Sequence, residues 1–263
     1  MKSDQQVHDQ GIVEQFTLQA KTFAAAPALS DAAFLKCILD AIQLQPDDTV
    51  LDVACGPGLV ACAMAGVARH ITGIDLTEAM LEQGKLRQQK LGLSNLTWQL
   101  GNALALPYAD ASFSVVHSRY SLHHTLDPQA VVAEMVRVCK PGGKLAIGDV
   151  YVTNEAQGKA YDHLEKLRDP SHVRALELNE LRTILQTTGI TNLREAYYGL
   201  ESDLEELLGR AYTTPAALDE IRQIFSSDLT QQRLGVKSHL RENRIWFEFP
   251  TVIMVGQKVQ KKL

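Results

Sequence analysis

The sequence predicts an α/β protein with a doubly wound, mostly parallel seven-stranded sheet, an antiparallel last strand and a helical lid. Three observations predict this class. Strand-like and helix-like stretches alternate five times between Thr49 and Val150, which favours a parallel sheet with right-handed crossovers. The first apolar run leads directly into a glycine-rich turn, Gly56-Pro57-Gly58. A final apolar run, 247–255, follows only after a long helical stretch.

The composition is that of a globular chain with one large domain. Of its 263 residues, 45% are apolar, which is enough for a hydrophobic core, so we expect a single domain over residues 1–263. The net charge of −5 argues against a nucleic-acid partner, because such proteins usually carry a basic surface. No apolar run approaches the roughly 20 residues of a membrane span. The polar N-terminus does not resemble a signal peptide.

The cysteines indicate the cellular compartment in which the protein is found. Cys37, Cys55, Cys62 and Cys139 show no spacing typical of a metal site, so we expect free thiols and no metal. Because free thiols are typical of a reducing environment, the sequence predicts a cytoplasmic protein.

The first part of the chain starts with helices and then continues with alternating strands and helices. Residues 9–44 read as helical, and Ser30 is the expected N-cap of the second helix. The next elements follow in chain order. They are strand 49–54, a helix from about Leu59, strand 71–75, a helix capped by Thr77 and ended by Gly92, strands 96–100 and 113–118, a helix that starts at Asp127-Pro128, and strand 144–150.

After Val150 the regular alternation stops. The expected elements are a helix 179–188, a strand 193–198, helical stretches 203–210 and 215–232, and the last strand. Because this strand comes so late, we expect an edge hairpin at the end of the sheet. The predicted domain therefore has N-terminal helices (1–44), a core (45–198 and 246–256) and a helical lid insertion (199–245).

The N-terminal and inserted helices carry apolar faces that need burial. Leu204, Leu208 and Ala211 share one helical face, and Leu218, Ile221 and Phe225 share another. We expect residues 1–30 and 199–245 to cover the carboxyl edge of the sheet and enclose a substrate. A homodimer interface is the alternative, since exposed apolar faces serve both purposes.

The glycine-rich turn and Asp75 together predict a nucleoside-containing ligand. Gly56 and Gly58 lack a Cβ, so the backbone can turn tightly and approach a ligand. The following helix presents free N–H groups and the positive end of its dipole. Asp75 ends the next strand, 19 residues after Gly56, where a carboxylate can accept hydrogen bonds from ribose hydroxyls.

Residues 56–61 also fit the dinucleotide pattern G-x-G-x-x-G/A, which is weak evidence alone. Asp52 argues against NAD as the cofactor, because dinucleotide-binding folds normally have an apolar residue at that position of the strand. The chain also lacks a second nucleotide-binding half and a separate catalytic domain. An NAD(P)-dependent oxidoreductase is therefore the least favoured interpretation.

Six ordered motifs indicate a different cofactor. They are VLDVACGPG at 50–58, GID at 73–75, GNALALP at 101–107, FSVV at 113–116, LHH at 122–124 and RVCKPGG at 137–143. In order and spacing they resemble the class I S-adenosylmethionine-dependent methyltransferases, especially the small-molecule enzymes related to ubiquinone and menaquinone biosynthesis (methyltransferase type 11). Residues 168–174 also resemble a segment of this subgroup, whereas residues 200–245 match nothing in it. The resemblance implies a Rossmann-like fold, S-adenosylmethionine as cofactor and methyl transfer to a small-molecule acceptor.

The resemblance also implies how the cofactor would be held. The residues implied at its methionine part are Asp52, Ala54, Cys55, Gly56, Gly58, Ser118 and Arg119. Those implied at its adenosine part are Asp75, Leu76, Met80, Gly101, Asn102 and Ala103. Asn102 stands where the family usually has Asp, which accepts a hydrogen bond from the adenine amino group. Asn can also accept through its carbonyl oxygen, so we expect binding to be retained and weakened.

Histidines are the candidate general bases if the acceptor must lose a proton. His123 and His124 follow the fourth strand at the carboxyl edge, and His172 follows the fifth. Adjacent residues point apart, so only one of the first two should face the site. Asp162, His163 and Glu165 lie on an amphipathic stretch, where a solvated helix face is favoured over a metal site. The same fold could instead serve a cofactor-binding regulator or a cyclase.

Overall fold

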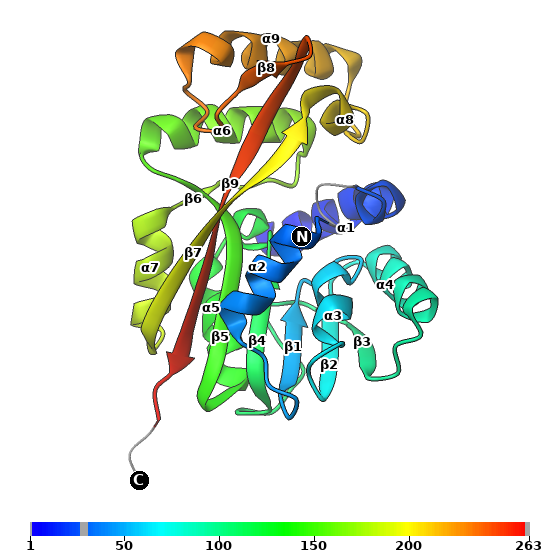
Figure 1. Cartoon of the computed structure of the whole chain (residues 1–263), viewed down its shortest axis with the longest axis vertical. Helices are drawn as coiled ribbons and strands as arrows, with labels where there is room; N and C mark the ends of the chain where they lie inside the picture. The colour runs from blue at the N-terminus through cyan, green and yellow to red at the C-terminus, as the bar shows by residue number, and fades with distance from the viewer. Residues whose placement is uncertain (1, 27–30, 261–263) are drawn as a thin grey trace.

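Seven strands form the main path of the central sheet, in the order β3-β2-β1-β4-β5-β9-β7 (Figure 1). The computed structural model describes residues 2–26 and 31–260. The strands are β1 (Thr49–Val53), β2 (His70–Asp75), β3 (Leu96–Leu100), β4 (Phe113–Arg119), β5 (Cys139–Val152), β7 (Ile190–Asp203) and β9 (Arg244–Lys258). The first five are parallel, and β9 runs antiparallel to both β5 and β7. The predicted sheet with its antiparallel last strand is therefore confirmed.

The end of the sheet differs from the expected edge hairpin in one respect. β9 lies inside the sheet between β5 and β7, so that β7 is the outermost strand. Two short strands complete the pairing, β6 (Leu176–Glu177) beside β5 and β8 (His239–Arg241) beside β9. Burial explains the order, because β9 contributes Val252, Ile253, Met254 and Val255 to the core, whereas most residues of the outer β7 are exposed or only partly buried.

Helices cover both faces of the sheet. They are α1 (Asp4–Ala24), α2 (Ala32–Ile42), α3 (Leu59–Met64), α4 (Glu78–Leu91), α5 (Pro128–Val138), α6 (Glu155–Arg168), α7 (Leu178–Thr187), α8 (Leu204–Leu208) and α9 (Pro215–Gln231). One apolar cluster joins α2 and α3 to one face, and another joins α5 and α7 to the opposite face. Because consecutive strand residues point to opposite faces, Val50 and Leu51 enter different clusters.

Local capping explains several helix boundaries. Asp127 accepts a hydrogen bond from the N–H of Ala130 at 2.9 Å and caps α5, as the sequence predicts. Gly92 ends α4 with a φ of 65°, also as predicted. The predicted cap Ser30 lies outside the described residues, and Asp31 caps α2 through the N–H of Phe34 at 2.6 Å. Thr77 occupies the N-cap position of α4 without a side-chain capping bond.

A separate apolar cluster holds α6, α8 and α9 beyond the carboxyl edge of the sheet, and β8 pairs with β9 there. We call these four elements, α6, α8, α9 and β8, the cap. β7 and β9 extend past the other strands and carry the cap, while α1 lies between the cap and the sheet (Figure 1). Tyr161, Phe225 and Phe247 are buried at its centre. None of the helices in the described part of the chain is long and apolar enough to span a bilayer.

The stretch around Asp162, His163 and Glu165 forms α6, and it is not uniformly solvated. His163 is exposed and contacts Glu220, as a solvated face predicts. Glu165, however, is only 4% exposed. The prediction was wrong for Glu165, because it lies on the face of α6 that also carries the buried Tyr161, and there it pairs with Arg168.

Candidate active site

A first cavity lies at the carboxyl edge of the sheet, beneath α1. Eleven of the sequence-predicted cofactor residues line it. They are Asp52, Ala54, Cys55, Gly56, Asp75, Leu76, Met80, Gly101, Asn102, Ala103 and Arg119. The loops that follow four strands bring these residues together, which explains why they are dispersed along the sequence.

Gly58 and Ser118 do not line this cavity. A Cβ on Gly58 would overlap the Trp98 ring, which also packs against Gly73 and Gly84, so Gly58 allows a close approach of α3 to β3. Ser118 is fully buried and donates a hydrogen bond to the Val53 carbonyl at 2.7 Å. Both residues therefore support the cavity from behind.

Asp75 holds the glycine-rich turn. Its Oδ2 accepts a hydrogen bond from the N–H of Gly56 at 2.8 Å, and its Oδ1 accepts one from the N–H of Thr77 at 2.9 Å. Burial raises the pKa of Asp75 to about 6, although these hydrogen bonds lower it in part. The carboxylate thus stands between the turn and the start of α4, at the cavity wall.

Asp52 forms a buried pair with His117, a residue that the sequence analysis missed. The two lie opposite each other on β1 and β4, and Asp52 Oδ1 contacts His117 Nδ1 at 2.7 Å. Asp52 Oδ2 is buried and has no hydrogen bond to any described residue, and Asp52 lines the first cavity. A buried carboxylate oxygen of this kind can accept a hydrogen bond from a ligand. The only sign of this pair in the sequence was a histidine, His117, within an apolar strand.

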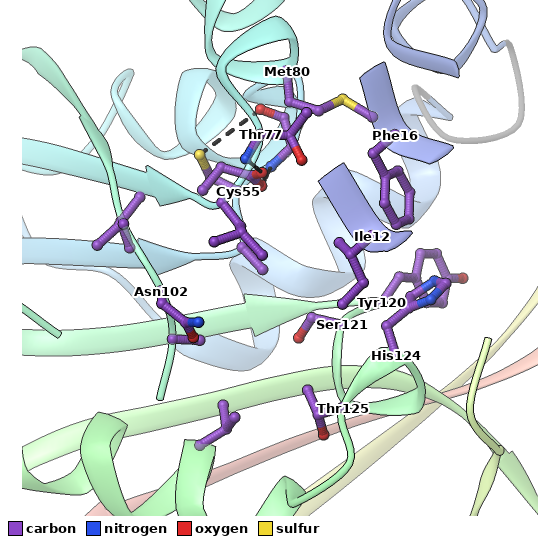
Figure 2. Close-up of a pocket in the computed structure, with 18 of the residues that line it drawn as sticks. Ile12, Phe16, Cys55, Thr77, Met80, Asn102, Tyr120, Ser121, His124 and Thr125 are labelled. Carbon is purple, nitrogen blue, oxygen red and sulfur yellow. Dashed lines mark hydrogen bonds between the residues drawn. The ribbon is translucent and has the colours of Figure 1, made fainter. Parts of the chain in front are cut away.

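α1 closes the first cavity from above. Ile12 and Phe16 point from α1 toward the loop after β4, which carries Tyr120, Ser121 and His124 (Figure 2). Tyr120 has a φ of 51°, a conformation that is rare for a bulky residue and is found mostly where function requires it. Sequence reasoning missed Tyr120, because no local pattern signals this backbone conformation.

A second cavity lies between the sheet edge, α1 and the cap. It shares four wall residues with the first cavity, namely Phe16, Phe23, Tyr120 and His124. Its other walls include the apolar residues Val150, Leu200, Leu207 and Phe249. Its polar wall residues include His123, Tyr161, Glu165, Arg168, Asp169 and Arg210. The two cavities are therefore neighbours that adjoin at these four side chains.

His123 lines the second cavity and is held by Asp149. Its Nδ1 lies 2.5 Å from Asp149 Oδ1, and Asp149 Oδ2 accepts from the N–H of Leu122 at 2.9 Å. Within the described residues, Nε2 of His123 has no hydrogen bond. Burial lowers the pKa of His123, but the carboxylates of Asp149, Glu165 and Asp169 together more than offset burial, so the net pKa is raised above 6.5. An imidazole oriented in this way can accept a proton through Nε2.

The other two candidate histidines have different environments. His124 lines both cavities, and its Nδ1 lies 3.1 Å from the Ser171 carbonyl. Burial and the neighbouring His123 lower the pKa of His124 to about 3. His172 lines neither cavity and contacts Asp162 through Nε2 at 2.8 Å. The structure thus favours His123 over His172 as a proton acceptor, and it keeps His124 neutral. Within residues 2–26 and 31–260, no group of three or more His, Cys, Asp or Glu is arranged to hold a metal ion.

Comparison with known proteins places this geometry in context. A family model described as a methyltransferase domain matches residues 51–147. The uncharacterized methyltransferase YcgJ of Bacillus subtilis is 28% identical over 82% of this chain and 90% of its own length. Its crystal structure superposes with a TM-score of 0.80, at 26% identity, over 88% of this chain and 100% of that chain.

Two further relatives have named reactions. The 27-O-demethylrifamycin SV methyltransferase of Amycolatopsis mediterranei is 34% identical over 66% of this chain and 61% of that protein. A demethylmenaquinone methyltransferase of Listeria welshimeri is 38% identical over 43% of this chain and 49% of that protein. The chain thus spans about half the length of the second relative.

Proposed function

Because the chain belongs to the class I S-adenosylmethionine-dependent methyltransferases, we propose that it methylates a small-molecule acceptor held in the second cavity. The observation that supports this proposal is the wall of Phe16, Phe23, Tyr120 and His124 that both cavities share. A cofactor in the first cavity and an acceptor in the second would meet at this wall. Such contact is the main requirement of methyl transfer, which depends on alignment of the reacting atoms.

The first cavity fits S-adenosylmethionine in its donor and acceptor groups. Asp75 would accept hydrogen bonds from the ribose hydroxyls, with Leu76, Met80, Asn102 and Ala103 around adenine. The free Oδ2 of Asp52 would accept from the methionine ammonium. The remaining residues proposed at the methionine part are Ala54, Cys55, Gly56 and the backbone of Ser118 and Arg119, while Gly58 shapes the turn and Gly101 the adenosine end. The sulfonium supplies an activated methyl group.

His123 is the proposed general base for an acceptor that carries a proton. Its free Nε2 would take the proton as the bond from the acceptor atom to the methyl carbon forms and the carbon–sulfur bond breaks. Asp149 would orient the ring and stabilise the imidazolium. His124, which stays neutral, would position the acceptor beside the shared wall.

We place both cavities in one domain over residues 1–263, in which α1 and the cap act as the lid. Phe16 and Phe23 of α1 and Leu207 of the cap cover the second cavity. Their apolar surface would keep water away from the activated methyl group.

Ligand-binding and turnover measurements test this function. The melting temperature should rise with S-adenosylmethionine and stay unchanged with NAD(P). Incubation of a small-molecule extract with methyl-deuterated S-adenosylmethionine should give a product that carries the label. The Asp75→Ala variant should show a smaller thermal shift and less labelled product at the same S-adenosylmethionine concentration. A thermal shift with NAD(P) alone would overturn the assignment of the cofactor, whereas S-adenosylmethionine binding without any methylated product would favour a regulator or a cyclase.

A further inference from the structure

One face of α6 is turned into the second cavity. Tyr161, Glu165 and Arg168 follow one another at intervals of four and three residues, so they lie in a row on the same side of the helix. All three line the cavity. Tyr161 is 2% exposed and Glu165 is 4% exposed, so this row of polar groups is largely removed from solvent.

This row has unused hydrogen-bonding capacity. Glu165 forms an ion pair through Oε2 with Arg168, but its Oε1 and the Arg168 Nε are buried without a hydrogen bond. Among the described residues the hydroxyl of Tyr161 also has no hydrogen bond. Buried polar groups are normally satisfied, so donors and acceptors of a bound molecule are the natural partners here.

Arg210 adds a positive charge to the same cavity. It follows α8, is half-buried, and forms no ion pair or side-chain hydrogen bond with any described residue. Burial lowers its pKa, Glu206 raises it and the like charge of Arg168 lowers it further. A guanidinium that is partly desolvated and repelled by a second guanidinium is costly unless an anion lies beside it.

The acidic side chains around this cavity are already engaged. Glu165 is paired with Arg168, and Asp149 is paired with His123. Asp169 accepts hydrogen bonds at Oδ1 from the Ser171 N–H at 2.9 Å and from its hydroxyl. None of these carboxylates pairs with Arg210, and Glu206, whose charge raises the pKa of Arg210, is exposed and forms no ion pair with it among the described residues. A carboxylate of a ligand could therefore pair with Arg210.

The rest of the cavity is apolar. Phe16, Phe23, Leu200, Leu207 and Phe249 form walls that a hydrocarbon or ring system would fill. We propose that the acceptor is a largely apolar molecule with a carboxylate, which Arg210 and Arg168 bind at the cap, while its methyl-accepting group lies beside His123. This inference rests on the proposed function and specifies the class of acceptor.

Binding of matched probes tests the inference without knowledge of the natural acceptor. Calorimetry would compare 3-phenylpropanoate, its amide and 3-phenylpropylamine on the full-length protein saturated with S-adenosylhomocysteine. We expect the acid to bind about tenfold or more tightly than the amide, because the acid gains charge-assisted hydrogen bonds. The Arg210→Gln variant should reduce this preference to less than about twofold, and Arg210→Lys should retain part of it.

The Arg222→Gln variant is the matched control, because Arg222 is an exposed arginine of the cap that pairs with Glu205 and Asp219 away from both cavities. It should keep the full preference for the acid. Equal binding of the three probes, no binding of the acid at millimolar concentration, or an unchanged preference in Arg210→Gln would overturn the inference. Preference for the amine would overturn it too and would assign the cavity to a cation held by Glu165. Binding of S-adenosylmethionine and transfer of the labelled methyl group are measured in separate experiments. Failure of the carboxylate inference can therefore be distinguished from failure of the proposed function.

Discussion

Asp9 on α1 and Asn102 after β3 are joined by a hydrogen bond of 2.8 Å from Asn102 Nδ2 to Asp9 Oδ2. Both residues line the first cavity. The neighbouring residue on α1, His8, contacts the carbonyl of His124 through Nε2 at 2.6 Å. Two consecutive residues of α1 therefore hold the helix to the segments after β3 and β4, which couples its position to the residues proposed to bind the cofactor.

The first prediction concerns this fastening. Asp9→Ala removes the acceptor, and Asn102→Asp places two carboxylates opposite each other, so both changes should loosen α1. We expect faster amide hydrogen exchange in residues 4–24 in both variants, and weaker S-adenosylmethionine binding in Asp9→Ala, by about 1–3 kcal/mol. Glu14→Ala is the control, because Glu14 is exposed on the same helix. Exchange rates like those of the wild type in both variants would show that the bond does not hold the helix.

The second prediction concerns Asp75. Asp75→Ala should weaken S-adenosylmethionine binding by about 1.5–3 kcal/mol through loss of hydrogen bonds to a charged acceptor. The raised pKa of about 6 adds a pH dependence. The ionised form accepts the ribose hydroxyls, so affinity should fall as the pH is lowered from 7 to 5, and Asp75→Asn should remove this dependence. Calorimetry with the exposed Asp47→Ala as control checks both effects; unchanged affinity in Asp75→Ala would exclude the ribose role.

The third prediction separates the two glycines of the turn. Gly58→Ala should destabilise the fold by about 2–4 kcal/mol, because its Cβ would overlap Trp98 and its φ is 71°. Gly56→Ala should cost only about 1–2 kcal/mol, from a φ of 53°, because its Cβ meets no described atom within 4 Å.

Gly56→Val should abolish cofactor binding, because Gly56 lines the first cavity. Urea unfolding and calorimetry measure the two effects. Gly11→Ala, an open helical position with no atom within 4 Å, is the control and should not destabilise the fold. Equal stability of the Gly56→Ala and Gly58→Ala variants would contradict the assigned packing role of Gly58.

The fourth prediction concerns His123. His123→Asn should lower kcat by about 10²–10⁴-fold if the acceptor loses a proton to this ring. A base must be neutral, so kcat/KM in the wild type should rise with pH through the pKa of His123, which lies above 6.5. Asp149→Asn should move this rise to lower pH, since it removes the charge that raises the pKa. The exposed His163→Asn is the control, and a pH profile that survives His123→Asn would assign the base elsewhere.

The fifth prediction concerns the N-terminal part of the lid. Removal of residues 1–30 should leave a folded core, since α2 and the sheet keep their apolar clusters, and should strongly reduce turnover. Circular dichroism, label transfer and sedimentation would be measured together. Full turnover would refute the lid role, and a change from dimer to monomer with intact turnover would support an interface instead.

The sequence by itself determined the order and type of most elements in the core. Strands such as Leu96–Leu100 and the boundaries at Asp127 and Gly92 depend on alternation, capping and φ preferences, which act over a few residues. The glycine-rich turn and Asp75 were predictable for the same reason, because a strand, a turn and a carboxylate occur at a fixed spacing.

Only the tertiary structure decided which residues meet. The pairs Asp52–His117 and Asp9–Asn102 join positions 65 and 93 residues apart, and no local pattern encodes such contacts. Tertiary packing likewise turned Glu165 of α6 inward, where it lines the second cavity. Local backbone preferences thus specify the elements, whereas the burial of their apolar faces against one another creates the two cavities and the groups that line them.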